Sequence, residues 1–218
     1  DAMDRLGGKG GRAVIVIAGN HDNPDRLCAA SPLAYKNGII LLGYPGSDAG
    51  EYRIEAEGIS IAGSGPGWLE LSMSRCDHNA VVLTMPFPSE SRLEEVLAGR
   101  ADEAVLQDAY SDKVGGILDA LSGKFRDDTV NLIVAHLFML GGSTSDSERT
   151  LQVGGAMTVD PSVIPEKTHY SALGHLHRPQ QIRSAPCPTY YAGSPLAYSF
   201  SEAGYSKAVY IVDAIPGQ

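Results

Sequence analysis

The sequence has little of what several protein classes require. Its 218 residues include only three cysteines, none of them in a C-x-x-C pair, so neither a disulfide framework nor a cysteine zinc site is indicated. No apolar run approaches the roughly 18 residues of a membrane span, and the first residues lack a basic-then-apolar signal sequence. These absences favour a cytoplasmic protein that has no contact with a membrane.

Basic residues are also scarce, because 17 Lys and Arg stand against 26 Asp and Glu, which gives a net charge of -9. Cations that neutralise phosphates supply most of the affinity of a nucleic-acid surface, and this chain has no excess of them. Any nucleic-acid substrate would therefore need metal ions or a partner protein to offset the charge.

Motifs for covalent catalysis are missing as well. Gly63-Ser64-Gly65 lacks the G-x-S-x-G frame, and Gly193-Ser194-Pro195 lacks the spacing of a nucleophile elbow. Hydrolysis through a covalent intermediate is therefore disfavoured.

The 43% of residues that are hydrophobic suffice for a substantial core in a single domain. Short apolar runs alternate with helical patterns, which is typical of an α/β fold. Strands are expected over residues 13–18, 38–43, 52–56, 58–62, 80–87, 130–135, 170–173, 189–192 and 207–213. Helices are expected near the start and over residues 24–30, 91–98 and 102–121, and long loops over 63–79 and 141–155.

Three of the expected strands finish in asparagine or histidine. The residues at these strand ends are Asn20, His21, His136, His175 and His177. Because ligands collect outside the carboxyl ends of strands in an open α/β sheet, these side chains are expected to converge. Neutral imidazoles and an amide oxygen suit divalent ions such as manganese, zinc or iron.

Each of these motifs has a structural alternative. His21 can lie in a polar turn after Asn20, and His136 alone would more often be a hydrogen-bonded core histidine. The pair His175 and His177 is harder to explain in this way, since two close imidazoles must not both be charged, and metal binding uses both in the neutral form. The remaining chemistry is attack by a metal-activated water, with paired ions stabilising the entering and leaving oxygens.

Longer segments carry a more specific resemblance. They are residues 86–93 (PFPSESRL), 135–137 (AHL), 147–149 (SER), 172–180 (ALGHLHRPQ) and 193–202 (GSPLAYSFSE). Asn20-His21-Asp22, His136 and residues 174–177 (GHLH) resemble motifs of the calcineurin-like binuclear metallophosphoesterases. Within that superfamily, the longer segments resemble the SbcD-type nuclease subunits of bacterial SbcCD DNA-repair complexes.

The resemblance implies a role for each candidate residue. Asn20, His136 and His175 would hold one manganese-type ion, and His177 would help to hold a second. His21 would contact the scissile phosphate and assist departure of the leaving group, while Asp22 would brace the loop. Each imidazole is expected to have a hydrogen-bonding partner, which the sequence does not name.

The implied fold is a four-layer α/β/β/α metallophosphoesterase sandwich over residues 1–218. The family's two earlier metal motifs, Asp-x-His and Gly-Asp, have no counterpart here, so the first two strands of the family fold are expected to be missing. The family's capping domain is also expected to be missing, because the sequence stops just after the strand expected over residues 207–213.

The implied function is metal-dependent DNA cleavage, exonucleolytic or endonucleolytic, in repair, recombination and replication. Its implied partners are DNA, an SbcC-type ATPase and a second copy of the same protein. Low activity is expected of these 218 residues alone. Two alternatives stay open: a phosphodiesterase acting on nucleotides or small phosphoesters, and a non-catalytic scaffold.

Overall fold

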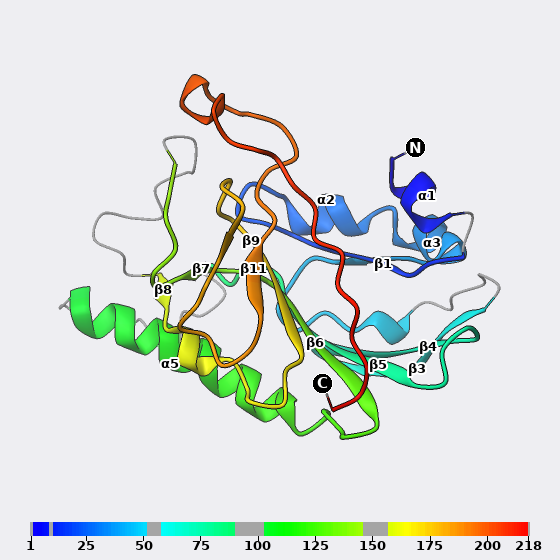
Figure 1. Cartoon of the computed structure of the whole chain (residues 1–218). Helices are drawn as coiled ribbons and strands as arrows, with labels where there is room; N and C mark the ends of the chain where they lie inside the picture. The colour runs from blue at the N-terminus through cyan, green and yellow to red at the C-terminus, as the bar shows by residue number, and fades with distance from the viewer. Residues whose placement is uncertain (1, 9–10, 52–57, 90–102, 146–156, 218) are drawn as a thin grey trace.

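A mixed sheet of seven strands forms the centre of the protein in a computed structural model that describes residues 2–8, 11–51, 58–89, 103–145 and 157–217 (Figure 1). Its strands are β3 (Ile59–Gly65), β4 (Trp68–Met73), β5 (Asn79–Met85), β6 (Thr129–His136), β9 (Tyr170–Gly174), β10 (Gln180–Gln181) and β11 (Thr189–Tyr191). They are ordered β10-β11-β9-β6-β5-β4-β3. The pairs β5–β6, β6–β9 and β9–β11 are parallel, so the carboxyl ends of these four strands lie at one edge.

A smaller parallel sheet consists of β1 (Val14–Ile17) and β2 (Ile39–Leu42). The short helices around it are α1 (Ala2–Gly7), α2 (Pro24–Cys28), α3 (Ser31–Ala34) and the 3-10 turn η1 (Tyr35–Asn37). The side chain of Asn23 caps α2 by accepting a hydrogen bond from the backbone N–H of Arg26. Pro24 occupies the first turn, where its missing N–H costs nothing.

The remaining described elements comprise one long helix, short 3-10 turns and a third sheet, which consists of two short parallel strands. They are η2 (Ala49–Glu51), α5 (Glu103–Ser122), β7 (Phe138–Met139), β8 (Thr158–Val159), η4 (Pro161–Val163) and η5 (Phe200–Glu202). Among the residues that the structure describes, no helix combines the length and the apolar character needed to cross a bilayer.

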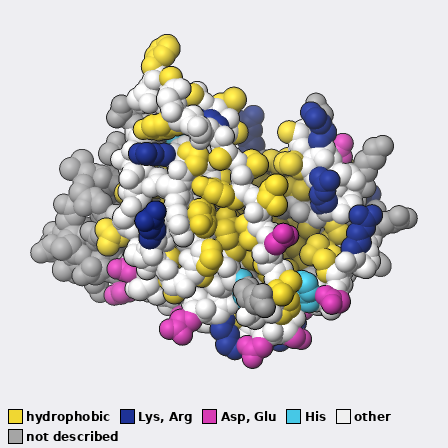
Figure 2. Space-filling model, viewed as in Figure 1, with side chains coloured by type: hydrophobic (Ala, Val, Ile, Leu, Met, Phe, Trp, Pro, Cys, Tyr) yellow, Lys and Arg dark blue, Asp and Glu magenta, His cyan; other side chains and the backbone are white. Residues whose placement is uncertain are grey.

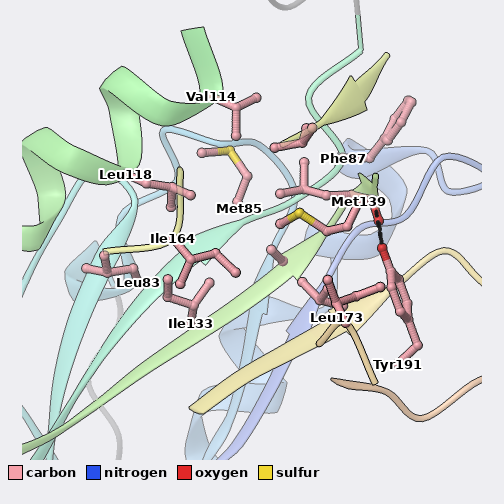
Figure 3. Close-up of a cluster of buried hydrophobic side chains, with 14 of the residues drawn as sticks. Leu83, Met85, Phe87, Val114, Leu118, Ile133, Met139, Ile164, Leu173 and Tyr191 are labelled. Carbon is pink, nitrogen blue, oxygen red and sulfur yellow. Dashed lines mark hydrogen bonds between the residues drawn. The ribbon is translucent and has the colours of Figure 1, made fainter. Parts of the chain in front are cut away.

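Two hydrophobic cores cover the two faces of the seven-stranded sheet. On one face, Leu83 of β5 and Ile133 of β6 pack with Val114 and Leu118 of α5 (Figure 3). On the other face, Val82 belongs to a second core that includes residues of β1, β2 and β4. Successive residues of β5 thus point into different cores, as strand geometry requires. This explains why β5 is apolar almost throughout rather than alternating.

Adjacent glycines in α5 give a test of this packing. Gly116 is exposed and a Cβ there would meet nothing within 4 Å, whereas a Cβ on Gly115 would lie 3.0 Å from Val163 Cγ1. Gly116→Ala should raise the free energy of unfolding by about 0.4–1 kcal/mol, because alanine reduces the entropy of the unfolded chain. In chemical denaturation, Gly115→Ala should show a smaller gain or a loss, and equal gains for both would contradict this account of how α5 packs.

The prediction of a long loop over residues 63–79 is wrong. Most of this segment forms a hairpin in which β3 turns through Pro66 and Gly67 into β4. Gly67 has a φ of 80°, as the third residue of a type II turn requires. The glycines of β3 also admit the indole of Trp68, since a Cβ on Gly65 would lie 2.6 Å from Trp68 Nε1. These glycines therefore allow close packing between two paired strands and do not indicate a loop.

The prediction of a strand over residues 207–213 is also wrong, because residues 206–215 have no regular secondary structure and pair with none of the described strands. Val209 and Ile211 are 84% and 93% exposed. Figure 2 shows hydrophobic side chains along the face where this segment runs in Figure 1. A short run of apolar residues favours a strand, but a strand also needs a partner strand with which to pair.

The expected elements at residues 52–56 and 91–98, and most of the loop at 141–155, lie outside the described residues. The other expected helices and strands are confirmed, with small differences at their ends.

Candidate metal centre at the ends of three strands

Side chains from the β1–β2 sheet and from the seven-stranded sheet meet at the carboxyl ends of β1, β6 and β9. Asn20 follows β1, His136 is the last residue of β6, and His175 follows β9. The Oδ1 atom of Asn20 lies 2.9 Å from Nε2 of His136 and 3.4 Å from Nδ1 of His175. The two imidazole rings are 5.4 Å apart at an angle of 74°. One amide oxygen is therefore a neighbour of two imidazole nitrogens that lie more than a hundred residues away from it in sequence.

Two glycines frame the imidazole of His136. A Cβ on Gly19 would lie 2.7 Å from its Cε1 atom, and a Cβ on Gly174 would lie 2.9 Å from its Nδ1 atom. The ring of Phe87 packs edge-on against the same imidazole at 6.0 Å, and the backbone N–H of Phe87 donates to the carbonyl of Ala18. His136 consequently has little room to turn.

Burial lowers the pKa of His136 to about 3, and the nearby imidazoles of His175, His21 and His177 contribute to that lowering. His136 is therefore neutral near pH 7 and keeps a lone pair on one ring nitrogen. A neutral imidazole is the form that binds a metal ion.

His175 has a left-handed backbone conformation, with a φ of 113°. Such a conformation costs a residue other than glycine on the order of 1–3 kcal/mol and persists only where the surroundings enforce it. His175 is the only such non-glycine residue in the part of the chain that the structure describes. The strain coincides with the point at which the side chain turns toward Asn20.

His21 and Asp22 lie on the exposed loop beyond Asn20. The Oδ2 atom of Asp22 accepts a hydrogen bond of 2.7 Å from the backbone N–H of Gly19, which closes this loop on itself. His21 is exposed and close enough to act electrostatically on His136. The loop thus presents one exposed imidazole beside the buried cluster.

His177 lies near the cluster but has a different partner. Its Nδ1 atom is 3.1 Å from Oε1 of Glu202, and its ring is 5.3 Å from that of Tyr198. Glu202 was missed by sequence reasoning, because a glutamate after Ser-Phe-Ser resembles any surface glutamate. Its only distinction in the sequence is that it ends the segment 193–202.

The donor set fits part of a site for one divalent ion. Asn20, His136 and His175 offer an amide oxygen and two imidazole nitrogens, which suit manganese, iron or zinc. Across the described residues, no three His, Cys, Asp or Glu side chains lie close enough to form a complete site by themselves.

The sequence is similar to those of two nuclease components. It is 44% identical over 218 residues to SbcD of the nuclease SbcCD from Bacillus subtilis (strain 168), covering all of this chain and 51% of that protein. It is 30% identical over 200 residues to the protein of the same name from Staphylococcus epidermidis, covering 92% of this chain and 45% of that protein. No family model matches the chain. The chain therefore spans about half the length of these curated relatives.

Proposed function

The chain is a homologue of SbcD, a component of the nuclease SbcCD, and on that premise we propose that it forms part of a metal-dependent nuclease that hydrolyses phosphodiester bonds in DNA repair and recombination. The observation that carries the proposal is the meeting of Asn20, His136 and His175 at the ends of three strands. Their neutral donor atoms suit a divalent ion, which we propose is Mn²⁺.

We further propose that residues 1–218 form a partial metallophosphoesterase core, in the four-layer α/β/β/α arrangement. The candidate layers, in order, are the short helices beside β1 and β2, the β1–β2 sheet, the seven-stranded sheet and α5. The two hydrophobic cores support this arrangement, since one lies between the sheets and the other beneath α5.

In the complete protein, Asn20, His136 and His175 would hold one ion, and His177 would contribute to a second. The bound ions would supply an activated water and stabilise charge on the phosphate oxygens. The amide Nδ2 of Asn20 is buried and has no hydrogen-bond partner in the described structure, so it can donate to a phosphate oxygen. His21 would donate a proton to the leaving oxygen from its exposed loop, and Asp22 would hold that loop.

The net charge of the chain and its homology to SbcD both bear on which partners the protein has. A chain with a net charge of -9 lacks the cations that supply most DNA affinity. We propose that an SbcC-type ATPase, together with the rest of the SbcD-type protein, holds the DNA in a cytoplasmic complex containing two copies of that protein.

A nuclease assay of the full-length protein tests the proposal. With Mn²⁺, it should cleave hairpin or double-stranded DNA faster than a small chromogenic phosphodiester, and removal of the metal by a chelator should abolish cleavage. Faster turnover of the small ester would instead support the phosphodiesterase alternative. A full-length protein that binds no metal and cleaves neither substrate would support the alternative of a non-catalytic scaffold.

A further inference from the structure

A buried carboxylate lies directly behind His177. The side chain of Glu202 is 0% exposed and belongs to η5, in the loop drawn in orange to red at the top of Figure 1. Burying a carboxylate costs several kcal/mol unless charged or polar partners compensate. The groups that contact Glu202 therefore indicate which interactions compensate for the burial of its carboxylate.

The two oxygens of this carboxylate face different groups. Oε2 accepts from Nζ of Lys207, from the backbone N–H of Tyr198 at 3.3 Å and from Oγ of Ser194 at 3.4 Å. Oε1 lies 3.1 Å from Nδ1 of His177 and 3.4 Å from Oγ of Ser145. Lys207 thus balances the charge at one oxygen, and the other oxygen faces the imidazole.

The backbone of His177 is fixed by the same group of residues. Its carbonyl oxygen accepts from the backbone N–H of Ser194 at 3.1 Å and from Nζ of Lys207 at 3.4 Å. Gly193 has a φ of 79°, and a Cβ there would lie 2.5 Å from that carbonyl. Both the main chain and the ring of His177 are therefore held by the segment from Gly193 to Lys207.

Resting on the proposed function, we propose that Glu202 is a positioning residue that fixes His177 in the tautomer required for metal binding, with Lys207 keeping the carboxylate in place. A carboxylate can only accept, so Nδ1 of His177 carries the hydrogen that it donates to Oε1. Nε2 then keeps its lone pair for the ion. Ligating histidines commonly use their second nitrogen in this way, and losing the partner costs about 10- to 100-fold in metal affinity.

The tautomer of His177 can be measured in the full-length, metal-free protein by long-range ¹H–¹⁵N correlation spectra. We expect the wild-type ring to carry its hydrogen on Nδ1, and Glu202→Gln and Glu202→Ala to shift the population toward the Nε2–H form. A wild-type ring with its hydrogen on Nε2 would overturn the proposal, and that measurement does not depend on whether a variant folds.

Titration of Mn²⁺ by calorimetry provides the second readout. Glu202→Gln, which keeps the size of the side chain, should weaken binding at the His177 side by about 10- to 100-fold. Glu166→Gln is the matched control, because Glu166 is exposed. A folded Glu202→Gln protein with unchanged tautomer and affinity would refute the role of Glu202. If the wild-type protein binds no Mn²⁺, the proposed function fails, and the tautomer still decides whether Glu202 orients His177.

Discussion

Replacing His21 with alanine in the full-length protein is expected to lower kcat on DNA by about 10²- to 10⁴-fold, the usual contribution of a positioned general acid. Bound manganese should stay nearly unchanged, because His21 lies on the exposed loop and not among the three clustered donor side chains. Elemental analysis alongside steady-state kinetics would measure both quantities.

His175→Ala serves as the opposite case. It removes an imidazole nitrogen that faces Oδ1 of Asn20, so metal content should fall together with activity. If His21→Ala loses metal as readily as His175→Ala, the roles proposed for these two histidines are wrong.

Gly19→Ala should damage the site without removing any proposed ligand. The new Cβ would lie 2.7 Å from Cε1 of His136, and that ring cannot retreat because Gly174 and Phe87 pack closely around it. We expect overpacking to cost about 1–3 kcal/mol of stability. Displacement of a ligating ring should weaken Mn²⁺ binding by about 10- to 100-fold, as loss of a ligand's support does.

Gly46→Ala is a suitable control, since a Cβ at this position meets nothing within 4 Å. In thermal unfolding and calorimetric Mn²⁺ titration, this control should behave like the wild-type protein. Normal metal affinity in Gly19→Ala would mean that the close approach of Gly19 to His136 has no part in forming the site.

The local sequence pattern was sufficient to predict most of the helices and strands and to identify the candidate ligands. Apolar runs such as that of β5 and the helical spacing of α5 are properties of adjacent residues, so periodicity reveals them. The hairpin of β3 and β4 was not predicted, because glycines usually indicate a loop. Here they make room for the indole of Trp68, which approaches them only when the two strands are paired.

Asn20, His136 and His175 could be placed at strand ends from the sequence, because each follows an apolar run. Other features of the site depend on the fold: Gly19 and Gly174 enclose His136, His175 has a strained backbone conformation, and Glu202 faces His177. Those contacts join residues on different strands and loops, and the burial that lowers the pKa of His136 exists only when the two sheets pack together. A histidine or glutamate carries no mark of such burial in its neighbours along the chain, so only the folded arrangement of segments reveals it.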